Sequence, residues 1–157
     1  INYIEMFKYP YATVSQLQIP NSNWWELERR LTLVFLGKSH SSSKVHDKVI
    51  HQLENAGPNC KQLEDLRKTA EHSRDAIYAG DFEALGRAMT ENTEAQGRMH
   101  PDLVCQDAWK VIEIAKSFGA LGLVREPFIT TARILSCRLA KSNKKGKICS
   151  GLRILFS

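Results

Sequence analysis

The side chains best suited to binding or catalysis form a short polar loop between an apolar run and an amphipathic segment. The run from Leu31 to Leu36 predicts a short strand, because a brief apolar stretch without polar alternation suits a strand covered on both faces. Val45, Val49 and Leu53 recur at spacings of four and predict a helix from about Ser43 to Asn55. The loop between them offers a cation, an imidazole and several hydroxyl groups: Gly37, Lys38, Ser39, His40, Ser41, Ser42 and Ser43.

A strand, a polar loop and a helix in this order can hold an oxyanion. The free amide groups and the dipole of a helix N-terminus favour negative charge, and Lys38 adds a full positive charge. The loop therefore predicts a phosphate-binding site. The alternative is structural: Ser42 or Ser43 caps the helix, and the rest of the loop is solvated. No Walker-type GxxxxGK[ST] motif supports the first interpretation over the second.

Other kinds of site chemistry find little support in the sequence. His46 and His51 are five residues apart and so lie on different faces of a helix, a spacing that does not suit metal ligands. No Ser/His/Asp or Cys/His set can be assembled from spacing alone. Several carboxylates stand where they favour the dipole at predicted helix starts: Glu64, Asp65, Asp81 and Glu83. We therefore predict no catalytic residue and no metal ligand in this chain.

The overall composition is that of a soluble globular domain. The chain has 157 residues, of which 43% are hydrophobic and 25% charged, enough for one ordinary core. No apolar run of 18 residues and no signal peptide is present, so we expect neither membrane insertion nor secretion, and a cytoplasmic location. The cysteines lack CxxC spacing and indicate neither a zinc site nor a disulfide framework: Cys60, Cys105, Cys137 and Cys149.

Positive charge is concentrated at the end of the chain. Residues 1–120 carry 14 Lys and Arg against 16 Asp and Glu, whereas residues 121–157 carry 8 against 1. A mildly acidic body with a basic end does not predict a specific nucleic-acid partner, because no aromatic platform interleaves the basic run from Lys141 to Lys147. The run is too polar and charged to bury, and we expect it to be disordered.

The periodicity of the sequence predicts three strands followed by four helices. Tyr3 to Met6 and Tyr11 to Ile19 alternate as the two strands of a hairpin, with the third strand at Leu31. The later helices are expected to end near Gly80, to begin at Asp81, and to begin at His100-Pro101-Asp102. Trp24 and Trp25 are expected to cover the sheet edge. The fold class predicted is α+β, an antiparallel sheet with helices packed on one face.

Several ordered motifs resemble the C-terminal half of GHMP-superfamily sugar kinases. They are INYIEMF, YATVSQLQIP, WWELERRLTLVFLGKSHSSSKVH, NTEAQGRMHPDLV and AKSFGALG, which together cover about Ile1 to Gly122. Within the superfamily the chain most resembles the branch of bacterial fucokinase domains and heptose 7-phosphate kinases. The resemblance implies the C-terminal lobe of a GHMP kinase, with a ferredoxin-like antiparallel sheet.

The resemblance also implies what this chain would contribute to a site. The segment Gly37 to Ser43 matches a family segment that faces the active-site cleft, so Lys38, Ser39, His40, Ser42 and Ser43 become candidates for phosphate or sugar contact. His100 with Pro101 matches a second family position near the cleft, although His100 also fits a plain helix-start residue. The family's glycine-rich ATP loop and catalytic Asp would lie upstream of Ile1.

After Gly122 the resemblance ends. The family continues with a basic, glycine-rich segment of the type KxxGAGGGG, whereas this chain reads LVREPFITTARILSCRLAKSNKKGKICSGLRILFS. Together with the change in charge, this leads us to predict two regions, a kinase-like domain over 1–122 and a divergent basic tail over 123–157. We hypothesise that the tail is translated in a shifted reading frame.

Two functions follow as hypotheses. The first is a fragment of an ATP-dependent sugar kinase acting on L-fucose or a heptose phosphate, inactive without the N-terminal lobe that would bind ATP and Mg²⁺. The second is a free-standing module that binds a phosphosugar or a nucleotide through Lys38 to Ser43, with the basic tail contacting an acidic partner. Stabilisation of the isolated chain by such a ligand would favour the second hypothesis.

Overall fold

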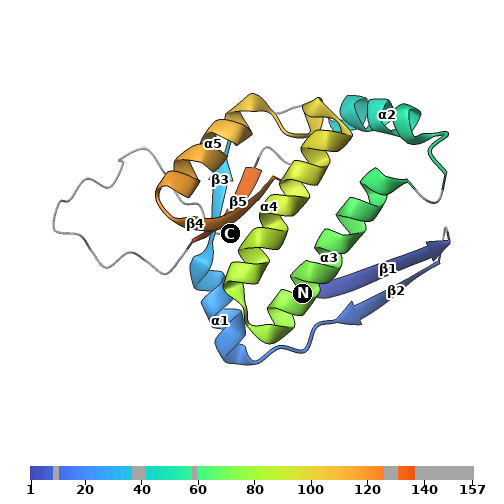
Figure 1. The fold of residues 1–157 in the computed structure, drawn as a ribbon. Helices are drawn as coiled ribbons and strands as arrows, with labels where there is room; N and C mark the ends of the chain where they lie inside the picture. The colour runs from blue at the N-terminus through green and yellow to red at the C-terminus, as the bar shows by residue number, and fades with distance from the viewer. Residues whose placement is uncertain (9–10, 37–41, 58–59, 126–130, 137–157) are drawn as a thin grey trace.

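The structure, a computed structural model, describes residues 1–8, 11–36, 42–57, 60–125 and 131–136 (Figure 1). The described elements follow one another along the chain in the order β1 (Asn2–Lys8), β2 (Tyr11–Gln16), α1 (Asn21–Arg30), β3 (Leu31–Phe35), α2 (Ser42–Leu53), α3 (Lys61–Ala79), α4 (Phe82–Met99), the 3-10 helix η1 (Pro101–Leu103), α5 (Gln106–Ser117), β4 (Ala120–Arg125) and β5 (Thr131–Ser136). The predicted α+β class is confirmed.

The strands form two small antiparallel sheets, where the sequence predicted one. β1 pairs only with β2 among the described strands, and this hairpin lies beside α3, where the Arg74 guanidinium stands over the Tyr3 ring, 4.7 Å from its centroid (Figure 1). β3 instead joins a three-stranded sheet of order β3-β5-β4. The hairpin and the first two strand positions were predicted correctly; the pairing partners of β3 were not, because they lie about a hundred residues further along the chain.

The predicted boundary at Gly122 falls within β4. β5 lies beyond that boundary, and it occupies the central position of the sheet, with Leu33 opposite Arg133 on one side and Val124 opposite Arg133 on the other. The described part of the sheet therefore draws on both predicted regions. Residues 137–157, which include the basic run, lie outside the described residues, so the shifted reading frame stays a prediction.

β3 is an edge strand, and one of its faces is open among the described residues. Leu33 and Phe35 point to the same side of the strand, and Phe35 is 71% exposed. The expectation that this strand is covered on both faces was therefore wrong. A short apolar run predicts a strand, but a run of this length does not distinguish a strand covered on one face from a strand covered on both.

The ends of α3 and α4 follow the local signals closely. α3 ends at Gly80, whose backbone is in the left-handed region (φ 67°) that glycine adopts without steric cost. The Asp81 carboxylate then accepts a hydrogen bond from the Ala84 amide at 2.9 Å and caps α4 as predicted.

Two helical regions differ from the prediction. Trp24 and Trp25 belong to α1, a helix that the sequence analysis did not anticipate, and Trp25 is 64% exposed rather than covering a sheet edge. The helix expected from His100 is divided into η1 and α5. α5 ends at Ser117, and Phe118, which follows it, is 84% exposed.

α4 and β4 approach each other closely at two glycines. A Cβ atom added at Gly86 would lie 2.5 Å from the Leu121 carbonyl oxygen, and one added at Gly122 would collide with the main chain at Gly86. The buried Thr93 hydroxyl, also on α4, donates a hydrogen bond to the Leu123 carbonyl at 2.9 Å. The glycines let the helix approach the strand, and the hydroxyl satisfies a main-chain acceptor beside it.

α5 packs on the other side of β4. The Leu123 side chain forms a core cluster with Ile112 of α5, while the preceding residue, Gly122, faces α4. Successive strand residues point to opposite faces, so α4 and α5 flank β4 on opposite sides, and the expectation of helices on one face only was wrong. In Figure 1, α4 passes in front of β4 and α5 lies to its left.

Candidate functional site

The directions of the strands bring the last residues of β3 and β4 to one end of the described sheet. β3 and β4 each run antiparallel to β5, so they are parallel to each other, and their last residues, Phe35 and Arg125, lie opposite Thr131 and Ala132 at the same sheet edge. The predicted phosphate loop leaves β3 at this edge. We call this the C-terminal end of the sheet.

α4 runs in the same direction as β4. Gly86 lies against Leu121, and Thr93, two turns further on, reaches the carbonyl of Leu123. The end of α4 therefore arrives at the C-terminal end of the sheet, where His100 follows it. His100 and the start of the predicted loop are brought to the same region of the fold.

The predicted loop itself falls largely outside the described residues: Gly37, Lys38, Ser39, His40 and Ser41. Ser42 and Ser43 form the start of α2, as the predicted helix requires, and their side chains are not described. α2 docks on the end of α4, where Val49 forms a buried cluster with Met99 and Leu103 (Figure 1). This cluster holds the helix that follows the loop beside the turn that contains His100.

His100 has a structural role in this turn. Its Nδ1 atom accepts a hydrogen bond from the Asp102 amide at 3.1 Å and so caps η1, with Pro101 in the first turn. The side chain is only 18% exposed. Because Nδ1 accepts, a neutral His100 carries its proton on Nε2. The geometry matches the helix-start alternative; contact of His100 with a ligand remains a prediction.

An ion pair joins α2 to η1 beside His100. The Lys48 ammonium lies 2.7 Å from an Asp102 carboxylate oxygen. The hydrogen bond and charge of Lys48 hold the pKa of Asp102 below its ordinary value. Both side chains are about half exposed, so this pair fixes the register between the two elements more than it stabilises the fold.

A pocket opens between α4 and α5 at the same end of the molecule. It has a volume of about 480 Å³ and includes Pro101, the neighbour of His100. Its lining combines a large aromatic ring with charged and amide side chains: Glu94, Gly97, Arg98, Pro101, Val104, Gln106 and Trp109. We call it the α4–α5 pocket. The sequence analysis missed it, since its residues come from several elements and show no motif; only the spacing of 94, 97 and 98 places three of them on one face of α4.

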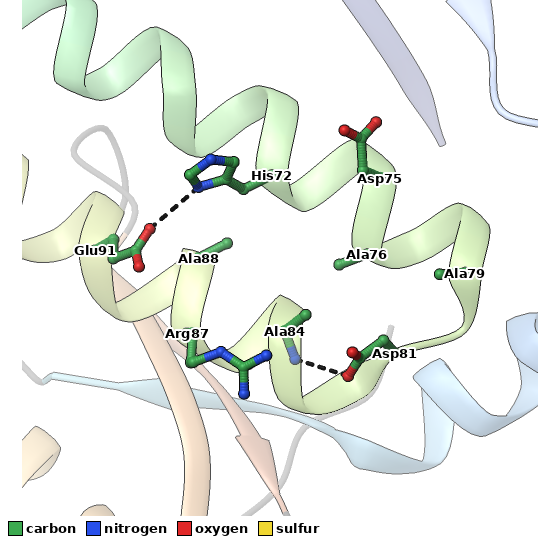
Figure 2. Close-up of a pocket in the computed structure, with 9 residues that line it drawn as sticks. All are labelled: His72, Asp75, Ala76, Ala79, Asp81, Ala84, Arg87, Ala88 and Glu91. Atoms are coloured by element: carbon green, nitrogen blue, oxygen red, sulfur yellow. Dashed lines mark hydrogen bonds and ion pairs between the residues drawn. The ribbon is translucent and has the colours of Figure 1, made fainter.

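A second cavity, of about 370 Å³, lies between α3 and α4 (Figure 2). Four alanines form its floor, and charged side chains surround it: Ala76, Ala79, Ala84 and Ala88, with His72, Asp75, Asp81, Arg87 and Glu91. Its polar groups are partly engaged already, because His72 Nδ1 lies 3.3 Å from a Glu91 oxygen and Asp81 caps α4. It lies along the first half of α4, away from the C-terminal end of the sheet.

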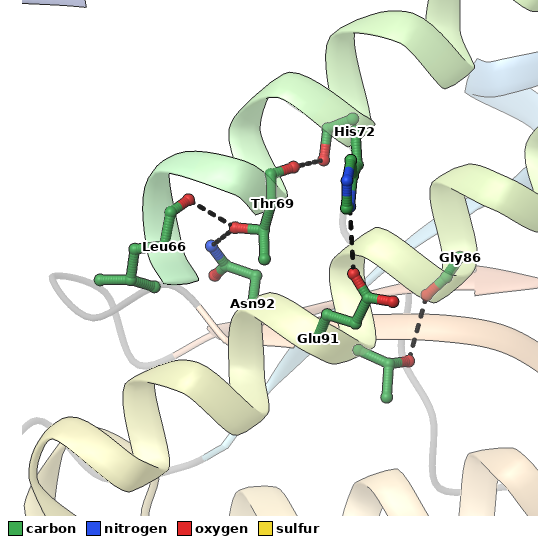
Figure 3. A network of polar contacts seen from close by, with 8 residues as sticks. Leu66, Thr69, His72, Gly86, Glu91 and Asn92 are labelled. Atoms are coloured by element: carbon green, nitrogen blue, oxygen red, sulfur yellow. Dashed lines mark hydrogen bonds and ion pairs between the residues drawn. The ribbon is translucent and has the colours of Figure 1, made fainter. Parts of the chain in front are cut away.

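Polar contacts hold α3 and α4 together beside this cavity (Figure 3). The Asn92 amide donates to the Thr69 hydroxyl at 2.9 Å, and that hydroxyl donates to the Leu66 carbonyl at 2.7 Å. Such a connected chain of hydrogen bonds fixes the helix pair rather than offering free groups to a ligand. We therefore place the candidate site at the α4–α5 pocket and the adjoining turn.

No group of three or more His, Cys, Asp or Glu side chains in the described part of the chain is arranged to hold a metal ion. No helix among the described residues is both long enough and apolar enough to cross a membrane.

Comparison with known proteins identifies the fold. No family model matches the chain, and no curated protein matches it in sequence. Among solved structures, the mevalonate kinase of L. major in complex with R-mevalonate is similar over 68% of this chain, with a TM-score of 0.60 and 23% identity. The chain shares part of the fold of this kinase. The predicted resemblance is thus confirmed at the level of fold.

A second kinase structure extends the likeness in fold. The D-glycero-D-manno-heptose 1-phosphate kinase of Bacteroides thetaiotaomicron is similar over 86% of this chain, with a TM-score of 0.51 and 16% identity. The chain spans 33% of the mevalonate kinase chain and 34% of the heptose 1-phosphate kinase chain. It therefore corresponds to about one third of each kinase.

Proposed function

We propose that this chain forms part of an ATP-dependent kinase that phosphorylates a hydroxyl group of a sugar or sugar phosphate. The observation that carries the proposal is the fold likeness to two kinases of small hydroxylated molecules. The end of β3, the turn at His100 and the α4–α5 pocket lie at one end of the described structure, which supports the proposal because a kinase site needs ligand-binding groups gathered at one place.

The proposal divides the work between this chain and the rest of the kinase. Phosphoryl transfer depends on positioning the reactants and on neutralising the charge of the transferred group, which ATP-dependent kinases achieve with Mg²⁺ and cationic side chains. We assign ATP and Mg²⁺ binding mainly to an N-terminal lobe outside these 157 residues. In this chain, Lys38 is the cation that we expect at the phosphates, with Ser39, His40, Ser42 and Ser43 offering further polar contacts.

The choice of sugar stays open between L-fucose and a heptose phosphate. Discrimination between them requires polar contacts to particular hydroxyl groups, and those contacts would come from both lobes. A phosphorylated substrate would suit the cationic loop, but ATP would suit it equally.

The test is a kinase assay on the longest natural polypeptide that contains this chain. ADP release is measured with L-fucose, heptose 7-phosphate and heptose 1-phosphate, each with ATP and Mg²⁺. We expect one substrate to be phosphorylated, and Lys38→Ala to raise the KM of the ligand it touches roughly tenfold. The matched control is Lys110→Ala, an exposed lysine on α5 near Asp107, which should leave KM unchanged. A polypeptide that folds and phosphorylates no sugar would refute the proposal.

The alternative is a free-standing module that binds a phosphosugar or nucleotide without catalysis. It is favoured by the three core clusters within the described residues, which give this portion a hydrophobic interior of its own. Thermal denaturation of the chain alone discriminates the two. A rise in Tm with ATP or a sugar phosphate, but no turnover in the longer polypeptide, would support the module.

A further inference from the structure

We propose that the α4–α5 pocket binds the uncharged, hydroxyl-bearing ring of a monosaccharide. The proposal rests on the proposed kinase function and deepens it, since it names the part of the substrate that this chain holds and the residues that hold it. The decisive side chains are Glu94, Gln106 and Trp109.

The pocket has the size and shape for a single sugar ring. Its volume of about 480 Å³ falls within the range of small-molecule sites. Gly97 leaves the space beside the edge of the Trp109 ring open, because a Cβ atom at this position would lie 3.2 Å from Cζ2 of the indole. Trp109 is anchored from behind by the core cluster of Ile112 and Leu123. A half-buried, anchored indole offers a rigid apolar surface with a polar edge, which suits the apolar face of a pyranose.

The pocket also presents hydrogen-bonding groups that the protein does not use. Within the part of the chain that the structure describes, the Glu94 carboxylate, the Gln106 amide and the Trp109 indole N–H have no hydrogen-bond partner. Glu94 supplies hydrogen-bond acceptors, Gln106 supplies an acceptor and a donor, and Trp109 supplies a donor. Sugar hydroxyls both donate and accept, so this combination matches a polyol better than it matches a purely apolar ligand.

The charge of the pocket argues for the ring rather than the phosphate. Arg98 is the only cation lining the pocket in the described structure, and it lies 3.6 Å from the Asp65 carboxylate, which offsets its charge. Glu94 adds a negative charge with no opposing partner among the described residues. A phosphate placed here would meet net negative charge, so we assign any phosphate of the substrate to the cationic loop and the ring to this pocket.

The experiment measures binding of uncharged sugars to the full chain in the absence of ATP. L-fucose and D-mannose are titrated separately, with saturation-transfer NMR as the readout, against Glu94→Gln, Gln106→Ala and Trp109→Phe. Inorganic phosphate serves as the charged probe. The matched controls are Glu113→Gln, an exposed glutamate on α5, and Trp25→Phe, an exposed tryptophan on α1. Circular dichroism checks that each variant is folded; Gln106 is exposed, so its variant tests the proposal even if Trp109→Phe unfolds.

We expect at least one of the sugars to bind, with Kd raised about tenfold by Glu94→Gln and by Trp109→Phe and changed less than about twofold by the controls. The proposal would be overturned if Glu94→Gln and Gln106→Ala bind the sugar as strongly as the native chain does, or if neither sugar binds. Phosphate binding that these variants abolish would also overturn it. The kinase assay is independent of these outcomes. Turnover that the pocket variants leave unchanged would support the kinase function and refute the sugar site in the pocket. Sugar binding without turnover would support the sugar site and refute the kinase function.

Discussion

Two glycines of α4 predict opposite effects of the same substitution. Alanine has a helix propensity about 1 kcal/mol better than glycine, so propensity alone predicts that Gly86→Ala and Gly97→Ala both stabilise the protein. Their surroundings differ. The new methyl at Gly86 would meet the main chain of Leu121, whereas the new methyl at Gly97 would meet only the edge of the Trp109 side chain.

The geometry gives the size of the effect at Gly86. The Cβ atom would lie 2.5 Å from the Leu121 oxygen, so α4 must retreat by about 0.9 Å to reach the 3.4 Å of an ordinary contact. Neither partner can rotate away, and overpacking of this kind costs roughly 1–3 kcal/mol. The same shift lengthens the hydrogen bond from Thr93 to Leu123, 2.9 Å in the native fold, and costs about 1 kcal/mol more. After the gain in propensity, a net loss of about 2 kcal/mol remains.

At Gly97 the contact is milder. The methyl would lie 3.2 Å from Cζ2 of the indole, and a shift of a few tenths of an ångström by that side chain relieves it. We therefore expect Gly97→Ala to be neutral or to stabilise by up to about 1 kcal/mol. Urea unfolding followed by circular dichroism measures both changes, and Gly86→Ala should also lower Tm by roughly 6 °C. If both variants shift stability in the same direction and by similar amounts, the close approach of α4 to β4 is not as described.

Three further substitutions test individual contacts. Thr93→Val keeps the shape of a buried side chain but leaves the Leu123 carbonyl without its donor, and urea unfolding should show a loss of about 2 kcal/mol. Lys48→Met should raise the pKa of Asp102 to its ordinary range in a carboxyl-carbon NMR titration. Since the native pKa is lowered, the contribution of the ion pair to stability is present at neutral pH and is lost as the pH falls below about 3.9. An unchanged titration of Asp102 would contradict the ion pair. Asp81→Ala removes the cap of α4 and should destabilise by about 1 kcal/mol in thermal unfolding, while Asp81→Asn retains most of the stability.

The parts of the fold that the sequence predicted are those with local causes. The hairpin strands alternate in sequence, and the break between α3 and α4 is encoded by two adjacent residues, Gly80 and Asp81. β5 had no comparable signal. Its place between β3 and β4 depends on pairing with residues about a hundred positions earlier, and the strand lies in a segment whose charge and lost resemblance suggested a divergent tail. Non-local pairing is the information that short-range patterns lack.

The candidate site shows the same division. A polar loop before a helix can be recognised locally, and so can His100 before a proline, although the structure shows for His100 only the capping role that was its alternative. The α4–α5 pocket could not be recognised in this way. Gly97 and Trp109 are twelve residues apart, and they lie together only because α5 folds back against α4. The sequence of neither helix specifies that arrangement.

The α4–β4 contact links the fold to the site, because α4 carries residues that line the pocket and β4 carries the residue that anchors Trp109. β4 pairs with β5, and β5 pairs with β3, the strand that precedes the predicted loop. α4 contains Gly97 and is followed by His100. A helix displaced from β4 at Gly86 would move these residues relative to Trp109, whose anchor is the β4 residue Leu123. Gly86→Ala should therefore weaken binding of a sugar as well as stability, whereas Asp81→Ala, which frays α4 at its far end, should lower stability and leave binding unchanged.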